Sequence, residues 1–357
     1  MQNTIKYEDN VNQLDEVAKQ SFLIKDPSEK YIHFLDSAIE EFNARLEYID
    51  RRSTDQTASQ DELLIVTTKT MMDMCKATEE LEQSVGYDKT VLKPIRENFR
   101  EKTKKYFEKS FCNRARIWPQ GYPGDYYMIE FVYRNAAMSS GIGFYLDRYF
   151  LGTTLSVAVR ERKELLRELV RLELNKRNKP ISTKILDVAC GSCREVFELT
   201  SDIVESGANI TCLDFDGDAL EFAANRFSSA GLLSDNISFR KYNAIKMINH
   251  ERNLKEFGMQ DVIYSVGFFD YLDDDILIRL LSSLYKLTNP GGSLIMSFKD
   301  RRKYKTFDNS WLLNWDAFFL RTEEDMLNIL EKAGIETSTL TSTREKSGVV
   351  VFFIAEK

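Results

Sequence analysis

The 357-residue sequence predicts an α/β fold: a doubly wound, Rossmann-like parallel sheet preceded by an all-helical N-terminal domain. Two observations predict it. From about residue 180 onward, short β-rich runs alternate with helical ones, which is typical of parallel strands joined by crossover helices. Before residue 110, apolar residues recur at spacings of three and four, which is typical of amphipathic helices. The length suits two domains, or one domain with a large extension.

Residues 1–114 are expected to form the helical domain. Three amphipathic segments cover residues 28–52, 62–85 and 91–111. The first carries apolar residues at Ile32, Leu35, Ile39, Phe42, Leu46 and Ile49. No glycine occurs between Met1 and Val85, which fits helices joined by polar connections.

Residues 115–179 differ in composition from the helical part before them, and they are expected to form a connector that acts as a lid. The stretch GYPGDYYMIEFVYRN (121–135) places glycine and proline directly before aromatic residues, and its YYMIEFVY part predicts a short helix. A second loop is predicted over SSGIGFYLDRYFLGTT (139–154), and a long helix over 155–179.

Residues 180–357 are expected to form the sheet domain, with helices between most of the strands. The strands are predicted at 184–189, 208–215, 237–243, 261–267, 293–298, 337–342 and 348–357.

Composition limits the classes of partner. The net charge of −7 disfavours nucleic acid, because binding phosphates depends on Lys and Arg. The basic run KDRRKYK (299–305) is interpreted as a solvated loop. No eighteen-residue apolar window predicts a membrane span, and the polar start MQNTIKYEDNVNQ lacks the apolar core of a signal peptide. Five sparse cysteines suit a reducing compartment, so we expect a cytoplasmic protein; its oligomeric state stays open, with a homodimer as one option.

The stretch ILDVACGSCREVFEL (185–199) admits a metal, a redox or a nucleotide interpretation. A structural zinc site needs four ligands. The chain offers Cys190, Cys193 and Cys212, but only two histidines, His33 and His250. A redox CxxC belongs to a thioredoxin-like unit, whereas the sheet pattern here is longer. We therefore expect no metal site and favour a nucleotide.

The nucleotide interpretation uses the whole stretch. After the strand ending at Ala189, Gly191 permits a tight turn against a ligand, and the next helix points its N–H groups at that turn. An acidic residue at the following strand end, Asp214, suits ribose hydroxyls, and Asp216 follows it closely. The sequence fingerprint of dinucleotide-binding proteins has three glycines, and only the middle one, Gly191, is present here. Asp187 would repel a pyrophosphate but suits a cationic ligand.

These motifs resemble those of the class I, Rossmann-like S-adenosylmethionine-dependent methyltransferases. ILDVACGSC resembles motif I, with Ala189 and Cys193 in place of its first and third glycines; LDFDGDAL and RKYNAIKM are similar to the ribose-side and adenine-side motifs. The resemblance spans about 180–300 and implies S-adenosyl-L-methionine as the cofactor. The residues it implies at the cofactor are Asp187, Ala189, Gly191, Asp214, Phe215, Asn243, Ala244, Ser265, Val266 and Gly267, with Tyr122 of the lid.

A narrower resemblance covers most of residues 115–330. The segments GYPGDYYMIEFVYRN, FDYL and WLLNWDAFFLRTEEDM are similar to a bacterial methyltransferase group with a helical N-terminal domain. Its members include enzymes that make 3-hydroxy fatty acid methyl ester signals. The resemblance implies a small-molecule carboxylate as methyl acceptor.

The candidate catalytic residues are Asp125, Tyr126, Asp270 and Arg321. A carboxylate acceptor needs a clamp, for which Arg321, Tyr122 and Tyr126 are candidates. An amine or hydroxyl acceptor needs a base, for which Asp125, Asp270 or His250 would serve. Structural alternatives stay open: Asp125 as a helix cap, Arg321 in an ion pair, and core packing for the aromatic residues Trp311, Trp315, Phe318 and Phe319, which recur at helical spacing.

Three other functions remain as alternatives. One is an NAD-dependent oxidoreductase, which shares the strand–turn–helix scheme. The second is a non-catalytic cofactor-binding protein. The third, a protein or RNA methyltransferase, is disfavoured by the acidic composition.

Overall fold

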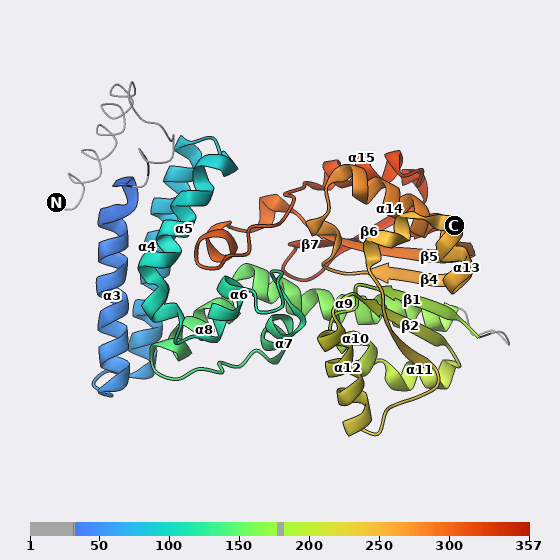
Figure 1. The fold of residues 1–357 in the computed structure, drawn as a ribbon, viewed down its shortest axis with the longest axis horizontal. Helices are drawn as coiled ribbons and strands as arrows, with labels where there is room; N and C mark the ends of the chain where they lie inside the picture. Colours follow the sequence, from blue (N-terminus) through green and yellow to red (C-terminus); the bar gives the residue numbers. More distant parts are fainter. Residues whose placement is uncertain (1–30, 32, 177–181) are drawn as a thin grey trace. The chain divides into compact units, whose positions relative to one another are not determined.

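The computed structural model describes residues 31, 33–176 and 182–357 (Figure 1). The chain divides into two compact units. The first ends at Asn113 and adds Ala137–Tyr149 and Thr306–Leu313; the second holds Arg114–Ala136, Phe150–Lys305 and Asn314–Lys357. The three-part division at residues 114 and 179 stays a prediction. The stretch interpreted as lacking a signal peptide, residues 1–13, lies outside the described residues.

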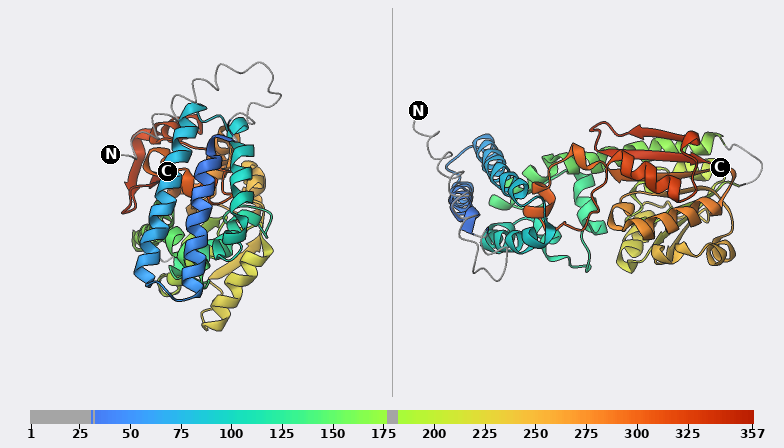
Figure 2. Two further views of the ribbon diagram at one scale, coloured as in Figure 1. Left: turned by 90° about the vertical axis from the view of Figure 1, so that its left-hand side faces the viewer. Right: turned by 90° about the horizontal axis from the view of Figure 1, so that it is seen from above.

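The first unit is helical. It contains α3 (Asp36–Thr54), α4 (Gln60–Ser84) and α5 (Lys89–Phe107), which confirm the three predicted amphipathic segments and lie side by side in blue to cyan in Figure 2. Short turns η1 (His33–Leu35) and η2 (Phe111–Asn113) flank them, and a π-helical turn, η6 (Phe307–Trp311), joins from far along the chain. Glu82 holds that turn, since it accepts hydrogen bonds from Trp311 Nε1 at 2.8 Å and Arg96 at 2.6 Å.

The predicted loop over 139–154 is wrong, because helix α8 (Ile142–Gly152) forms there. Glycines suggested the loop, but Gly143 has a packing reason. A Cβ at Gly143 would lie 1.9 Å from the carbonyl oxygen of Lys109, so only glycine lets the helix approach that backbone. The buried Asp147 carboxylate accepts from the N–H groups of Phe111, Met138 and Ser139 and fixes the segment before the helix.

The second unit contains a seven-stranded sheet of order β3-β2-β1-β4-β5-β7-β6. Strands β1 to β5 pair with one another in parallel, and β7 pairs antiparallel with both β5 and β6. All seven predicted strands are confirmed. Their bounds are β1 (Lys184–Val188), β2 (Asn209–Asp214), β3 (Ile237–Lys241), β4 (Gln260–Ser265), β5 (Thr288–Lys299), β6 (Leu340–Arg344) and β7 (Val350–Glu356).

Helices cover both faces of this sheet, so the doubly wound α/β fold is confirmed (Figure 1). Leu186 and Val188 of β1 pack in one apolar cluster, which includes α14 and α15, while Ile185 packs in the other, with α9 to α12. The helices are α6 (Arg114–Ile117), α7 (Tyr126–Arg134), α9 (Thr154–Lys176), α10 (Arg194–Glu198), α11 (Thr200–Ser206), α12 (Gly217–Ser229), α13 (His250–Phe257), α14 (Asp274–Leu287) and α15 (Glu323–Lys332). The short turns are η3 (Ala244–Ile248), η4 (Phe269–Tyr271), η5 (Arg301–Lys303) and η7 (Thr337–Thr339).

The helical spacing of the aromatic residues near 311–319 does not correspond to an α-helix. Trp311 ends the π-helical turn η6, and the chain from Trp315 to Phe319 is irregular. Trp311, Trp315 and Phe318 are nevertheless buried, whereas Phe319 is exposed. Within the described ranges, no helix is long and apolar enough to cross a membrane.

Candidate cofactor and acceptor site

The turn after β1 has an unusual backbone. Ala189, Gly191 and Cys193 all have positive φ, at +61°, +55° and +49°. A hydrogen bond of 3.0 Å from the N–H of Cys193 to the carbonyl oxygen of Cys190 closes the turn. Glycine adopts this conformation most readily, and motif I has glycine at these three alternating positions. The geometry supports the alignment with motif I, in which Ala189 and Cys193 hold glycine-like conformations.

Asp214, at the end of β2, is joined to this turn. Its Oδ2 accepts from the N–H of Gly191 at 2.8 Å, and its Oδ1 accepts from the N–H of Asp216 at 2.9 Å. Burial raises the pKa of Asp214, and the two N–H donors oppose that effect because they favour the charged form. The structure therefore brings together two predicted cofactor residues, Asp214 and Gly191.

Asp187 lies beneath the turn with an unsatisfied oxygen. Its side chain is 2% exposed, and its Oδ2 has no hydrogen-bond partner. Burial, and then the neighbouring Glu195, raise the pKa of Asp187. A buried acceptor without a partner is costly, so this oxygen fits a site that a ligand donor completes.

The thiols of the turn bear on the metal alternative. Ligand atoms of Asp187, Cys190 and Cys193 lie within 4.8 Å of one another. The buried Cys212 interacts with Cys193 from β2. A structural zinc site requires four ligands, and this group would need Cys212 to complete it. The expectation of no metal at this turn stays a prediction.

The GYPGDY segment packs against the end of β2 within the same unit. The hydroxyl of Tyr122 donates to Asp216 Oδ2 at 2.7 Å, and its ring lies 5.0 Å from that of Phe215 between centroids. Phe215 is 52% exposed. Tyr122, Phe215 and Asp214 therefore lie together beside the turn. Their contact with a cofactor stays a prediction.

Asp125 and Tyr126 make contacts that stabilise the fold around α7. Asp125 caps α7 by accepting from the N–H groups of Tyr127 and Met128 at 2.9 and 3.0 Å, and it pairs with Arg114 at 2.8 Å. This geometry favours the helix cap over a general base. The ring of Tyr126 lies 5.3 Å from that of Phe222.

A second group of predicted residues gathers after β4. Asp270 is buried and accepts from Lys299 Nζ at 2.5 Å, while the hydroxyl of Tyr271 accepts from Trp315 Nε1 at 2.5 Å. A Cβ at Gly124 would lie 2.3 Å from the ring of Trp315, so this glycine lets the tryptophan pack against the GYPGDY segment. The sequence predicted neither Lys299 nor this role of Gly124.

Arg321 is bound by a carboxylate and by backbone carbonyl oxygens of its own unit. Its guanidinium donates to the Asp274 carboxylate and to the carbonyl oxygens of Phe269 and Leu272. It is buried, and these contacts hold the chain that follows β4. The structure favours the ion-pair alternative over a substrate clamp for Arg321.

The remaining predicted cofactor residues have local roles. Asn243 caps the turn η3, and Ala244 packs in the core. Ser265 donates from its hydroxyl to the carbonyl oxygen of Val188 at 2.7 Å, and Val266 packs against the second apolar cluster. Their part in cofactor binding stays a prediction.

Several residues that hold the turn carry no motif and were missed. Glu130 of α7 is buried and accepts from Ser192 Oγ at 2.7 Å and from Arg226 at 2.6 Å. These contacts tie α7 to the turn and to α12. Periodicity predicts that Glu130 lies on an amphipathic helix, but only the fold reveals which side chains it meets.

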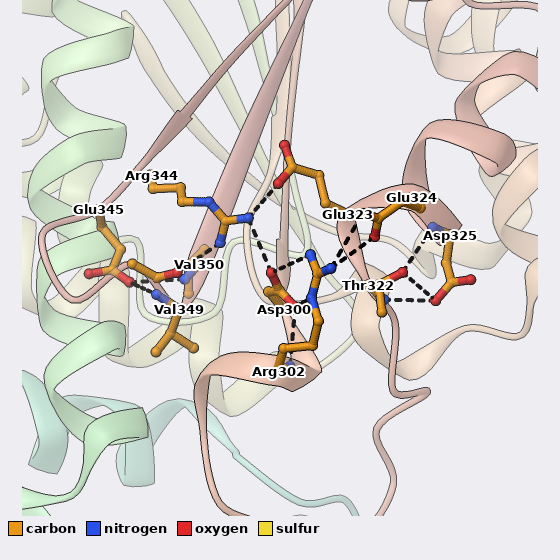
Figure 3. A network of polar contacts seen from close by, with 11 residues as sticks. Asp300, Arg302, Thr322, Glu323, Glu324, Asp325, Arg344, Glu345, Val349 and Val350 are labelled. Atoms are coloured by element: carbon orange, nitrogen blue, oxygen red, sulfur yellow. Dashed lines mark hydrogen bonds and ion pairs between the residues drawn. The ribbon is translucent and has the colours of Figure 1, made fainter.

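Two cations of the basic run 299–305 pair with carboxylates: Lys299 with Asp270, and Arg302 with Asp300 (the second pair is drawn in Figure 3). Asp300 pairs with Arg302 at 3.0 Å and with Arg344 at 3.1 Å, and Arg302 also reaches Glu324. A depression of about 450 Å³ is lined by Asp300, Arg302, Lys303, Arg344, Ser347 and Gly348. Acidic side chains therefore pair with Arg302 and Arg344, two of the residues that line this depression.

Comparison with known proteins matches one segment of the chain to a domain family. Residues 186–294 match the family model of a methyltransferase domain. No curated protein matches the chain. The match supports an S-adenosylmethionine-dependent methyltransferase, with S-adenosylmethionine as its cofactor, on a Rossmann-like methyltransferase fold.

Solved structures share only low identity with the chain. A protein described as a possible exported protein from Bordetella parapertussis is 21% identical over 64% of this chain and 79% of that one, with a TM-score of 0.49. Magnesium protoporphyrin IX methyltransferase from Synechocystis PCC 6803, with bound SAM, is 14% identical over 57% and 84%, with a TM-score of 0.41. An O-methyltransferase family protein from Burkholderia thailandensis is 15% identical over 59% and 62%, with a TM-score of 0.41.

Proposed function

We propose that this protein transfers the methyl group of S-adenosylmethionine to a small-molecule acceptor. One observation carries the proposal. The positive-φ turn at Ala189, Gly191 and Cys193 is hydrogen-bonded to the Asp214 carboxylate at the neighbouring strand end, inside the segment that matches a methyltransferase domain. Ligands of open α/β sheets bind at the carboxyl ends of strands, where these residues lie.

Each residue near the turn has a proposed part. Asp187 would accept from the ammonium group of the cofactor, since its Oδ2 has no other partner. Asp214 would accept from ribose hydroxyls, because each carboxylate oxygen has a second lone pair beyond its backbone N–H donor. Tyr122, from the lid, and Phe215, directly after β2, would cover the cofactor. The sulfonium supplies an already activated methyl group, so the protein has to align the acceptor and exclude water.

The acceptor that we propose is a carboxylate, which would become a methyl ester. The aromatic side chains of Tyr271, Trp315 and Phe318 lie beside the Asp270–Lys299 pair after β4. A carboxylate acceptor needs no general base, and two of the three candidate bases, Asp125 and Asp270, are paired with cations. By resemblance to the bacterial group, a 3-hydroxy fatty acid in a bacterial cytoplasm is the narrower proposal. An amine or hydroxyl acceptor, with Asp270 or His250 as base, is the second candidate.

The test combines binding and turnover. Calorimetry should show that S-adenosylhomocysteine binds and that reduced nicotinamide dinucleotide does not; the reverse result would favour the oxidoreductase. Transfer of labelled methyl to a cell extract should place label in small organic-soluble molecules that release it as methanol in alkali. Alkali-stable label would favour an amine or hydroxyl acceptor, and label in macromolecules would contradict a small-molecule acceptor. Cofactor binding without any transfer would indicate a non-catalytic binding protein.

A further inference from the structure

Arg162 is a buried cation that forms no ion pair within the described residues. It lies on α9, and its side chain is 6% exposed. Three arginines are buried in the described part of the chain, namely Arg96, Arg162 and Arg321. Arg96 pairs with Glu82 and Arg321 with Asp274, but Arg162 forms no ion pair with any described residue. Its Nε also lacks a hydrogen-bond partner.

The guanidinium lies directly against the loop that follows β4. A Cβ on Gly267 would be 2.9 Å from both terminal nitrogens of Arg162. Gly267 also has a φ of +87°, so glycine is required at this position both for the backbone and for the space that Arg162 fills. The sequence predicted Gly267 as a cofactor residue, and the structure shows that it makes room for an arginine at the carboxyl edge of the sheet.

Four polar groups surround Arg162 from different elements of the same unit. They are Tyr133 of α7, Glu195 of α10, Tyr271 after β4 and Lys299 of β5. Burial raises the pKa of Tyr133, Glu195 and Tyr271, and the charge of Arg162 opposes that effect. Burial lowers the pKa of Lys299, and the charge of Arg162 acts in the same direction. Lys299 forms an ion pair with Asp270, so the carboxylate of Asp270 is neutralised by Lys299 and not by Arg162.

We propose that Arg162 binds a carboxylate group at the carboxyl edge of the sheet, an inference that rests on the proposed methyltransferase function. An unpaired buried charge is strongly unfavourable, and an arginine fork matches a carboxylate with two parallel hydrogen bonds. Two sources of that group are compatible with the position between the β1 turn and the β4 loop. One is the amino-acid tail of the cofactor; the other is the carboxylate of the acceptor.

The test uses the full-length protein and three probes. S-adenosylhomocysteine carries the tail carboxylate, its decarboxylated analogue lacks it, and decanoate stands in for an apolar carboxylate acceptor. Calorimetric titrations compare wild type with Arg162→Gln and Arg162→Lys. The matched control is Arg171→Gln, because Arg171 lies on the same helix in an exposed ion pair with Asp202. Thermal melts establish that each variant is folded.

The titrations distinguish the two sources of the carboxylate. If Arg162 binds the carboxylate of the cofactor tail, Arg162→Gln lowers the affinity for S-adenosylhomocysteine about a hundred-fold. The affinity for the decarboxylated analogue then stays unchanged. If it holds the acceptor, S-adenosylhomocysteine binding is unchanged and Arg162→Gln abolishes decanoate binding to the loaded protein. Arg162→Lys should restore only part of either affinity. Unchanged titrations with both carboxylate probes overturn the inference, whereas a wild type that fails to bind S-adenosylhomocysteine would overturn the proposed function itself.

Discussion

The Asp214 carboxylate accepts a 2.8 Å hydrogen bond from the backbone N–H of Gly191, and thereby joins the end of β2 to the turn after β1. The same carboxylate fixes the chain that leads to α12 through the N–H of Asp216. One buried side chain thus holds both segments that are expected to contact the cofactor. Its removal should disturb the turn as well as the ribose contact.

We expect Asp214→Asn to reduce the affinity for S-adenosylhomocysteine by about ten- to a hundred-fold. Asparagine offers one acceptor oxygen, so one of the two N–H groups would face an NH₂ donor. Calorimetry measures the change, and Asp202→Asn, in the exposed pair with Arg171, is the control. An affinity equal to that of wild type would contradict the proposed role of Asp214.

Ala189→Gly should increase the free energy of unfolding by about 1 kcal/mol, because alanine is strained at a φ of +61°. Urea denaturation measures it. Ala224→Gly, within α12, provides the opposite expectation: a loss of about 1 kcal/mol from reduced helix propensity. A loss of stability in Ala189→Gly as well would show that the positive φ carries no strain.

The hydrogen bond from Tyr122 to Asp216 should be measurable as a coupling. In a double-mutant cycle of Tyr122→Phe and Asp216→Ala, we expect an interaction energy of about 1–3 kcal/mol, since a hydroxyl donates to a buried carboxylate. Tyr285→Phe on α14, which packs on the opposite face of the sheet from α12, should be additive with Asp216→Ala. A coupling near zero for the first pair would mean that the GYPGDY segment is not held there in solution.

Stability should depend on pH through Asp308. Burial raises the pKa of Asp308 to about 6, although the hydrogen bond from Tyr149 opposes the shift. The folded state therefore holds a proton that the unfolded chain releases near pH 4. This contribution to stability is complete below pH 4 and is lost as the pH rises towards 6, with a slope of at most about 1.4 kcal/mol per pH unit.

Asp308→Asn should lack that slope, as measured by urea unfolding from pH 4 to 7. The control Asp202→Asn tests the opposite sign. The hydrogen bond from Arg171 lowers the pKa of Asp202, so this carboxylate stabilises the fold above the unfolded pKa and loses its effect as the pH falls. Identical pH profiles for wild type and Asp308→Asn would refute the assignment.

The buried thiols give a further expectation. We predict that protein purified from zinc-replete medium holds far less than one zinc ion per chain, because in the described part of the chain only three ligand atoms, from Asp187, Cys190 and Cys193, lie within 4.8 Å of one another and a structural zinc site needs four. Elemental analysis measures it. One zinc per chain in wild type, lost in Cys193→Ser, would establish the metal alternative instead.

The positions of the strands along the chain, the helical N-terminal part and the candidate turn could all be predicted from the sequence. Hydrophobic periodicity reports which faces of an element are buried, and it located β1, β2 and β4 as well as α3 to α5. The spacing from Gly191 to Asp214 indicated that two strand ends share a ligand, because parallel strands end at one edge of the sheet. The sequence pattern gave a wrong prediction at α8, where a glycine allows close packing of a helix and does not mark a loop.

The tertiary structure alone decided which charged side chains are free. The sequence does not distinguish Arg321, which is bound by Asp274 and two carbonyl oxygens, from Arg162, which forms no ion pair with any residue that the structure describes. Both are arginines in ordinary local contexts. Pairing depends on which elements meet in space, and the contacts of Arg162 come from α7, α10, the β4 loop and β5. Local pattern therefore determined the scaffold and the turn, whereas long-range packing determined where a ligand carboxylate would find an unneutralised charge.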